Sequence, residues 1–257
     1  MNTFNKIKLE HQHDNQILGL TLNAPKGNVL DKEMMTELTE AVSKAGREDS
    51  VKALVFRGEG DHFSFGASVP EHQKKLVGEM LATFHELMRT LIETSKPMVA
   101  VVRGQCLGGG LELAAFCHWI FAAEDAMFGQ PEIKLGVFPP VASLILPYGV
   151  GQSAAEDLIL SGRSIPASRA KELGLVHSIS ADPEQELAAF ISEHILPKST
   201  AALQFAVKSS RYEMHQAFLR NIDAVEKLYV QDLMTTEDAN EGIQAFMEKR
   251  KPVWKNR

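Results

Sequence analysis

The chain has 257 residues, of which 44% are hydrophobic and 23% charged, so it can bury a substantial globular core. Its formal net charge of −6 and the lack of a long basic run argue against nucleic acid as the main partner. No apolar run is long enough to span a membrane and the first residues lack the apolar core of a signal peptide, so we expect a cytoplasmic protein without membrane partners.

The first sixty residues carry the patterns of a hairpin, a helix and a further strand. Alternating apolar and polar residues predict strands at 7–10 and 16–22, with a polar turn between them. Asp31 then marks the start of a helix. Its apolar stripe is Met34, Leu38, Val42 and Ala45. A buried strand is expected at 52–56, followed by a turn-rich loop.

The middle of the chain alternates loops, one long helix and short strands. Residues 62–68 form an apolar segment with a glycine, which is either a ligand-facing loop or an ordinary strand-to-helix connection. The spacing predicts one helix over 71–94. Its apolar face is Leu76, Met80, Phe84, Leu87 and Leu91. Strands are expected at 98–102 and 119–122, with a glycine run and a short helix between them.

The second half becomes progressively helical. Residues 128–132 read as a loop, and residues 136–148 are unusually apolar. Helices are expected at 153–160 and 167–173, and the last clear strand at 175–179. From about residue 184 the pattern is helical, with a break near Pro197. We therefore expect an α/β core in residues 1–197, containing the functional site, and an α-helical region in 198–257.

The cysteines and histidines show no metal-binding pattern. Cys106 and Cys117 lie in apolar surroundings, which favours buried free thiols over a disulfide or a metal site. No histidine spacing resembles a metal site either. We therefore interpret the histidines as structural or surface residues.

The run Gly108-Gly109-Gly110-Leu111-Glu112 lies at a strand-to-helix junction. Glycine lets the backbone approach a ligand closely, and a helix start offers unpaired N–H groups at the positive end of the dipole. An oxygen that gains negative charge during a reaction would be stabilised there. A glycine-rich turn before a buried helix accounts for the same residues equally well.

Two glutamates, Glu112 and Glu132, are set among apolar residues beside glycine-containing turns. Burial makes a carboxyl group reluctant to ionise, which suits general acid–base catalysis. Each could equally be a helix-terminus charge or a salt-bridge partner. The sequence contains no nucleophile-elbow serine motif and no dinucleotide-binding glycine motif after the first strand.

Several segments in register resemble the crotonase (enoyl-CoA hydratase/isomerase) superfamily over nearly the whole chain. They are residues 63–67, 102–114, 128–136, 160–163, 170–176 and 246–251. The resemblance implies an α/β fold, the crotonase (ClpP-like) spiral of β-β-α units, with a C-terminal α-helical region. It also implies a homo-oligomer, a trimer or dimer of trimers, with residues 198–257 at the subunit contacts.

The resemblance implies a role for individual positions. The backbone N–H groups of Ala67 and Gly109 would form an oxyanion hole for a thioester carbonyl, and Glu112 and Glu132 would be the two catalytic glutamates. One glutamate would activate water, and the other would exchange a proton with a substrate carbon. Substrate and CoA contacts are implied for Lys26, Phe65, Ala67, Gly108, Val137 and Phe138, and for Phe246 and Lys249 of a neighbouring subunit. No metal or redox cofactor is expected, because the CoA thioester of the substrate supplies the electron sink.

The chain departs from the usual hydratase pattern at two places. Ser68 stands where many enoyl-CoA hydratases have aspartate, and the stretch after Gly136 is apolar instead of glycine-rich. Together with residues 65–69 and 103–107, this stretch is similar to that of the cyclohexa-1,5-diene-1-carbonyl-CoA hydratases. That likeness implies hydration of a cyclic conjugated dienoyl-CoA in anaerobic benzoyl-CoA degradation. Neutral change in core packing would account for the apolar stretch as well.

Three other functions fit the same residues. They are hydration of a straight-chain enoyl-CoA, isomerisation of an enoyl-CoA double bond, and binding without catalysis, as in an RNA-binding relative. Two carboxylates favour hydration over isomerisation, because isomerases of the superfamily often keep only one. The acidic balance and the paired glutamates disfavour RNA binding.

Overall fold

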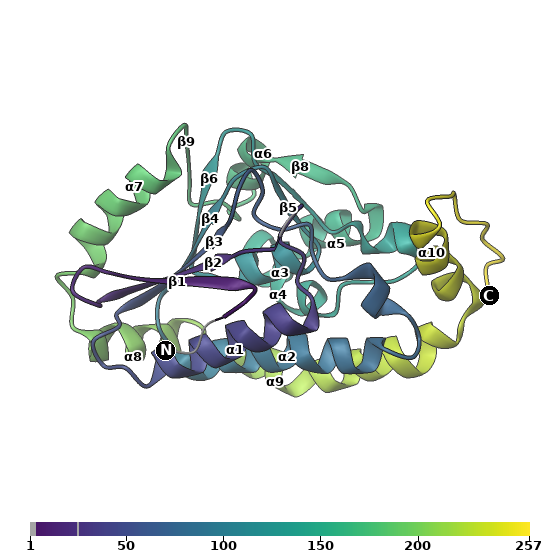
Figure 1. Ribbon diagram of the computed structural model, residues 1–257, viewed down its shortest axis with the longest axis horizontal. Helices are drawn as coiled ribbons and strands as arrows, with labels where there is room; N and C mark the ends of the chain where they lie inside the picture. The colour runs from purple at the N-terminus through teal and green to yellow at the C-terminus, as the bar shows by residue number, and fades with distance from the viewer. Residues whose placement is uncertain (1–3, 25) are drawn as a thin grey trace.

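The computed structural model describes residues 4–24 and 26–257, which build two β-sheets surrounded by helices (Figure 1). The large sheet contains β1 (Ile7–Gln12), β2 (Ile17–Leu22), β3 (Ala53–Gly58), β4 (Met98–Val102), β6 (Trp119–Ala123) and β9 (Ser178–Ser180), paired in that order. The small sheet pairs β5 (Gln105–Leu107), β7 (Met127–Gly129) and β8 (Ser164–Pro166).

The predicted hairpin and first helix are confirmed. Strands β1 and β2 pair antiparallel with Ile7 opposite Leu22, and all later pairs in the large sheet are parallel. Helix α1 (Lys32–Gly46) starts where predicted, because the Asp31 side chain accepts a hydrogen bond from the Met34 N–H at 2.9 Å. The predicted apolar stripe of α1 is buried against the sheet.

Both faces of the large sheet are covered, which explains its nearly continuous apolar strands. In β3, Leu54 and Phe56 point into the main core, while Ala53 and Val55 pack in a second cluster on the other face. Helix α7 (Pro183–Phe190) and the π-helical turn η3 (Ile191–Ile195) cover that second face. Figure 1 shows α7 on one side of the sheet, and α1 and α3 on the other.

The strand order repeats in units that position the candidate site. Strands β4 and β5 are followed by α3 (Gly109–Phe116), and β6 and β7 by the 3-10 turn η2 (Pro131–Leu135) and α4 (Pro140–Val150). In each unit the first strand joins the large sheet and the second joins the small sheet. The β-β-α expectation is therefore confirmed, although the three-residue strands β5, β7 and β8 lie in segments not predicted as strands.

Two predicted boundaries were wrong. The segment 71–94 is two elements, the 3-10 turn η1 (Val69–His72) and α2 (Val77–Thr94), because Gln73 has an extended backbone with ψ 142°. The last strand begins at Ser178, later than predicted. The N–H groups of Leu175 and Val176 instead bond to the Ala170 carbonyl and close the end of α6 (Ala167–Glu172).

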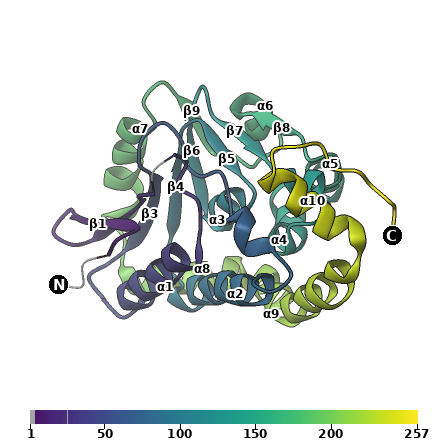
Figure 2. The same ribbon diagram turned by 45° about the vertical axis from the view of Figure 1, so that its right-hand side comes forward.

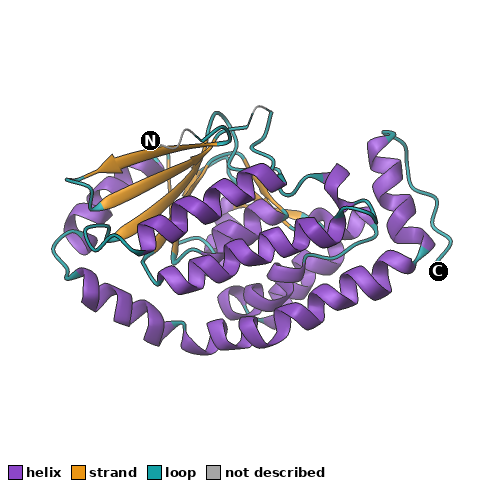
Figure 3. Cartoon of the chain, turned by 60° about the horizontal axis from the view of Figure 1, so that its bottom comes forward, coloured by secondary structure: helices purple, strands orange, loops and turns teal. Residues whose placement is uncertain are grey.

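The C-terminal quarter is helical, as predicted, with its break between η3 and α8 (Thr200–Ser210). Helix α9 (Tyr212–Lys227) contacts α2 and α4 and runs along the bottom of the molecule in Figure 3. The turns η4 (Leu228–Asp232) and η5 (Leu233–Thr235) lead to α10 (Glu237–Met247), which contacts η1 and η2 at the end of the molecule opposite α7 (Figure 2). Helix α5 (Gln152–Ser161) packs on α4. Among the described helices, none combines the length and apolar character needed to cross a bilayer.

Candidate active site

Glu112 lies in the first turn of α3 and is almost completely buried. Its Oε1 accepts a hydrogen bond of 2.6 Å from the N–H of Ala142, in the first turn of α4. Burial raises the pKa of Glu112 to about 7, although the N–H groups of Ala142 and Val141 favour the charged form. The group can therefore gain and lose a proton near neutral pH, as general acid–base catalysis requires.

Glu132, in η2, lies against Gly108 of the glycine run that leads into Glu112. A Cβ placed on Gly108 would lie 2.5 Å from Glu132 Oε1, so the carboxylate occupies the space that this glycine leaves free. Gly108 also has φ +50°, a conformation that favours glycine. With its amide nitrogen toward the carboxylate, the fully buried Gln130 donates to Glu132 Oε2 at 3.0 Å. The carboxylate is thereby held in one orientation.

The two carboxyl groups influence each other's ionisation. Burial raises the pKa of Glu132 well above its ordinary value, and the negative charge of Glu112 raises it further. Like charges in one buried site cannot both ionise at low cost, so the pair titrates as a unit. At neutral pH the pair retains a proton and offers a base and an acid together.

The N–H groups of Ala67 and Gly109 lie side by side. A Cβ placed on Gly109 would lie 3.3 Å from the Ala67 nitrogen, and one placed on Gly66 would lie 3.3 Å from the Gly109 nitrogen. Among the described residues, neither N–H has a hydrogen-bond acceptor. The Gly109 N–H is also the first of α3, where the helix dipole adds positive potential. The two donors form a site for an oxygen that carries negative charge.

Backbone bonds fix the two loops that carry these donors. Leu30 donates to the Gly66 carbonyl at 2.9 Å, and the Ser68 N–H donates to the Leu30 carbonyl at 3.2 Å. On the other loop, the Gly108 N–H donates to the Gly129 carbonyl of β7 at 2.9 Å. The small sheet thus connects the glycine run to the segment that leads into Glu132. Because the donors are already in place, stabilising an oxyanion requires little reorganisation.

A cavity of about 810 Å³ opens onto Ala67, Gly108 and Glu132, whereas Glu112 and Gly109 are not among its lining residues. Of the residues predicted to bind substrate, it is lined by Phe65, Ala67, Gly108 and Phe246, and Glu132 lines it as well. Phe246 comes from α10 of the same chain, so a neighbouring subunit is not needed to bring it there. The lining is mostly apolar and the volume suits a small acyl group with part of its carrier.

The other predicted contacts lie outside this cavity. Val137 is buried in the core, and Phe138 packs its ring edge-on against Tyr229, with the ring centres 5.2 Å apart. Lys26 and Lys249 are exposed and do not line the cavity. Their contacts with CoA stay predictions.

The sequence did not single out three residues at or near the site: His72, Arg250 and Tyr229. His72 lines the cavity, its Nδ1 lies 2.9 Å from the Ser68 carbonyl oxygen, and burial lowers its pKa. Arg250 also lines the cavity and pairs with Glu241, with Nη2 2.8 Å from Oε2. His72 lies in a short turn without a periodic pattern, and Arg250 is one residue of a basic tail, so neither had a distinguishing signal.

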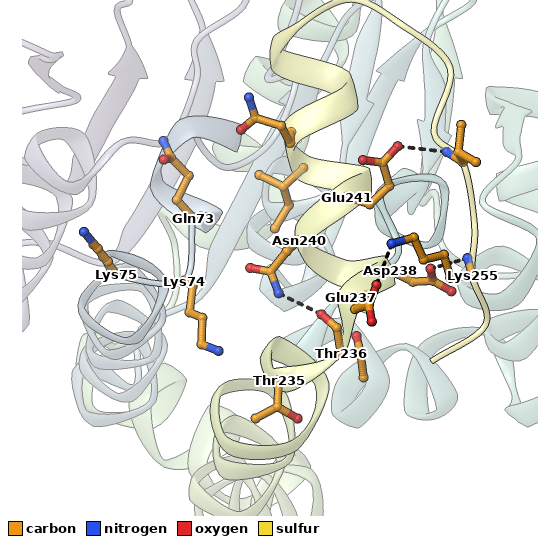
Figure 4. Close-up of a pocket in the computed structure, with 13 residues that line it drawn as sticks. Gln73, Lys74, Lys75, Thr235, Thr236, Glu237, Asp238, Asn240, Glu241 and Lys255 are labelled. Carbon is orange, nitrogen blue, oxygen red and sulfur yellow. Dashed lines mark hydrogen bonds and ion pairs between the residues drawn. The ribbon is translucent and has the colours of Figure 1, made fainter.

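A second hollow of about 930 Å³ lies between α10 and the loop that precedes α2 (Figure 4). Lys74 and Lys75 project from that loop, while Glu237 and Asp238 on α10 bind the C-terminal tail. Its lining residues carry both charge signs and do not include Glu112 or Glu132. The acid–base chemistry therefore lies in the cavity beside Glu132.

Comparisons with known proteins agree with this geometry. A family model described as enoyl-CoA hydratase/isomerase matches residues 12–257. The chain is 43% identical over 251 residues to a cyclohexa-1,5-dienecarbonyl-CoA hydratase of Thauera aromatica, covering 98% of this chain and 97% of that protein. It is 36% identical to a probable enoyl-CoA hydratase of Bacillus subtilis, covering 94% and 96%.

Solved structures show the same fold. The crystal structure of an enoyl-CoA hydratase/isomerase from Xanthobacter autotrophicus Py2 superposes with a TM-score of 0.85 at 29% identity, covering 96% of this chain and 94% of that one. The crotonase fold expected from the sequence is thus confirmed. The chain belongs to the enoyl-CoA hydratase/isomerase family and is a hydro-lyase that acts on acyl-CoA thioesters.

Proposed function

We propose that this protein adds water to a cyclic conjugated dienoyl-CoA, cyclohexa-1,5-diene-1-carbonyl-CoA, and forms a hydroxycyclohexene-carbonyl-CoA. The observation that carries the proposal is the pair of carboxyl groups, the buried Glu112 and the partly buried Glu132, set beside two free N–H donors. The ring substrate is supported by the 43% identity to a hydratase named for that substrate, against 36% to the probable enoyl-CoA hydratase.

In this mechanism the thioester oxygen accepts hydrogen bonds from the Ala67 and Gly109 N–H groups. Water held between the two glutamates gives a proton to the ionised carboxylate, and its oxygen bonds to a carbon conjugated with the thioester. The π electrons move to the thioester oxygen, where the two donors stabilise the enolate-like charge. The protonated carboxyl group then supplies a proton to carbon, so one water molecule is added in total.

The pKa values of Glu112 and Glu132 suggest a different role for each carboxyl group. A carboxyl group with pKa about 7, Glu112, can serve as base or acid at neutral pH. The more strongly raised pKa of Glu132 favours its protonated form. We therefore propose Glu112 as the group that takes the proton from water in hydration, and Glu132 as the group that protonates carbon.

The apolar segment after Gly136 supports a compact ring as the acyl group. Phe138 fixes an aromatic pair with Tyr229, and α4 then begins at Pro140 with the N–H groups that hold Glu112. Neither ring lines the cavity, and we propose that the packed pair limits how far a long flexible chain can extend past the carboxyl groups. A flat six-membered ring needs width near the reacting atoms and little depth beyond them.

The wider setting is also a proposal. The reaction requires no metal or redox cofactor, because the thioester accepts the electrons and water is the only co-substrate. We propose a trimer or a dimer of trimers in the cytoplasm, in anaerobic degradation of benzoyl-CoA after reduction of the ring. The mass of the protein in solution tests the assembly.

The test is a comparison of kcat/KM for cyclohexa-1,5-diene-1-carbonyl-CoA and for crotonyl-CoA with the same enzyme preparation. The proposal predicts a preference for the ring of at least about tenfold, which corresponds to about 1.4 kcal/mol of transition-state stabilisation. A preference for crotonyl-CoA would refute the ring assignment and favour straight-chain enoyl-CoA hydration, which the probable enoyl-CoA hydratase relative supports.

A further inference from the structure

Tyr229 is a buried tyrosine whose hydroxyl group has no partner in the part of the chain that the structure describes. Only 1% of the residue is exposed, and it lies in the π-helical turn η4 that continues α9. A buried polar group left without a hydrogen bond costs about 1–3 kcal/mol. A phenylalanine would fill the same space without that cost, so the hydroxyl group needs an explanation other than packing.

A ring contact and an electrostatic influence place Tyr229 near the acid–base pair, although it is not among the residues that line the cavity. Its ring packs edge-on against Phe138, which in the chain lies between Glu132 of η2 and the α4 residues that bind Glu112. The charges of Glu132 and Glu112 add to the effect of burial in raising the pKa of Tyr229, yet neither carboxylate is hydrogen-bonded to the hydroxyl. The phenol therefore stays protonated, and its donor is not used by either carboxylate.

Ion pairs between α9 and α2 fix the helix that carries Tyr229. His85 on α2 bonds to Glu226 on α9, with Nδ1 2.6 Å from Oε2, and Arg89 pairs with Asp223 one turn earlier. These contacts join α9 to α2 just before η4 begins. The phenol is thus carried on an anchored helix, as expected of a group that must meet a substrate at a defined place.

We propose that the Tyr229 hydroxyl group donates a hydrogen bond to the oxygen that the enzyme adds to its substrate. This inference rests on the proposed hydration, but it concerns the added oxygen and not the ring. A water molecule between two carboxyl groups gives a hydrogen to the carboxylate that deprotonates it and one lone pair to the new C–O bond. Its second lone pair remains available, and the phenol is a neutral donor beside these acceptors.

The same bond acts in the reverse direction. When the hydroxyacyl-CoA loses water, the C–O bond breaks and its electrons go to the oxygen, which takes a proton from the protonated carboxyl group. A donor on that oxygen stabilises the charge that develops on it. The hydroxyacyl-CoA therefore makes a hydrogen bond to Tyr229 that the dienoyl-CoA, which has no hydroxyl group, cannot make.

The experiment is Tyr229→Phe, measured in both directions. Because the overall equilibrium constant is fixed, kcat/KM should fall by the same factor for hydration and dehydration, about tenfold for one lost hydrogen bond. KM should rise for the hydroxyacyl-CoA and change little for the dienoyl-CoA. The melting temperature should stay the same or rise, because the variant removes a buried hydroxyl group that has no protein partner.

Tyr148→Phe is the matched control, since Tyr148 is half exposed on α4 and should change neither activity nor melting temperature. Unchanged kcat/KM in Tyr229→Phe would overturn the inference, and so would a lower melting temperature or an equal rise of KM for both thioesters. If the enzyme prefers crotonyl-CoA, the changes in KM are measured with crotonyl-CoA and 3-hydroxybutyryl-CoA instead. The role of Tyr229 is then tested even if the ring assignment fails. A wild-type enzyme that hydrates neither thioester would overturn both.

Discussion

The two ends of the candidate site are built from different parts of the chain. At the thioester end, the donors are the backbone N–H groups of Ala67 and Gly109, and glycines leave room for Glu132 and for the neighbouring loop. At the proposed acyl end, side chains from distant segments meet, as Phe138 and Tyr229 do, although neither lines the cavity. The first end depends on backbone conformation, and the second depends on which side chains fill the space.

This difference separates the residues that would determine the type of reaction from the residues that would determine the choice of substrate. In the proposed mechanism any thioester would use the same two N–H donors, so the thioester end would determine the class of reaction. In the proposed site the acyl group would contact side chains, which can change without moving the backbone. Mutations at the first end should therefore abolish turnover of every substrate, and mutations at the second should alter the ranking of substrates.

The largest expected effect follows removal of either carboxylate. Glu112→Gln and Glu132→Gln should each lower kcat by about 10²–10⁴-fold, the usual contribution of a general acid or base. Glutamine keeps the shape and, at residue 112, an oxygen for the Ala142 N–H. Steady-state hydration assays measure the loss, with the exposed Glu124→Gln as control. Full activity in both folded variants would contradict the two-carboxylate mechanism.

Gly108→Ala tests the thioester end. The new Cβ would lie 2.5 Å from Glu132 Oε1 and would require φ +50° of an alanine, so the carboxylate and the adjoining N–H donor must shift. We expect a loss of about 10²–10³-fold in kcat for ring and straight-chain thioesters alike. Gly149→Ala is the matched control, because a Cβ there meets no atom within 4 Å. A loss confined to one substrate would show that this end also selects the acyl group.

Glu112→Gln should also change the pH dependence of stability. Folding raises the pKa of Glu112 from its ordinary value of 4.5 to about 7, so its contribution is fully present below pH 4.5 and is lost as the pH rises through 7. The variant should match the wild type near pH 4.5 and exceed it at pH 8.5, by up to about 3 kcal/mol in the free energy of unfolding. Urea unfolding at the two pH values measures this. If the free energies of unfolding of the variant and the wild type differ equally at both pH values, ionisation of Glu112 does not destabilise the folded protein.

Phe138→Ala tests the acyl end and has the smallest expected effect. Loss of the ring leaves a space against Tyr229, in the segment that joins Glu132 to the residues that bind Glu112. We expect the preference for the ring substrate over crotonyl-CoA to fall by about 10–100-fold, the range of a hydrophobic pocket contact. Competition between the two thioesters measures the ratio, and Phe205→Ala, at an exposed site, serves as control. An unchanged ratio would remove Phe138 from substrate selection.

Local patterns were enough to predict most of the fold. The alternating strands at the N-terminus, the cap at Asp31 and the helix that starts at the glycine run all follow from neighbouring residues. The three-residue strands of the small sheet were missed, because pairing with distant partners makes them strands. The start of α2 was missed because Leu76 continues the apolar spacing although it is 44% exposed and precedes the helix.

The sequence alone was enough to propose the loops that carry the N–H donors and the carboxyl groups of the candidate site. Glycines and carboxyl groups beside them can be recognised from the sequence, and the motif resemblance joined the Ala67 loop to Gly109 and Glu132. Tyr229 and His72 could not be recognised in this way. Tyr229 follows an amphipathic helix, where an aromatic residue looks like ordinary core, and only the folded chain brings it to Phe138.

The most direct test of the central claim, that two carboxyl groups beside two N–H donors add water to a thioester-conjugated double bond, is turnover of cyclohexa-1,5-diene-1-carbonyl-CoA in ¹⁸O-labelled water. Mass analysis of the product should show one added water molecule that carries the label, and Glu112→Gln and Glu132→Gln should slow its appearance. A product of unchanged mass with a moved double bond would contradict hydration and establish isomerisation.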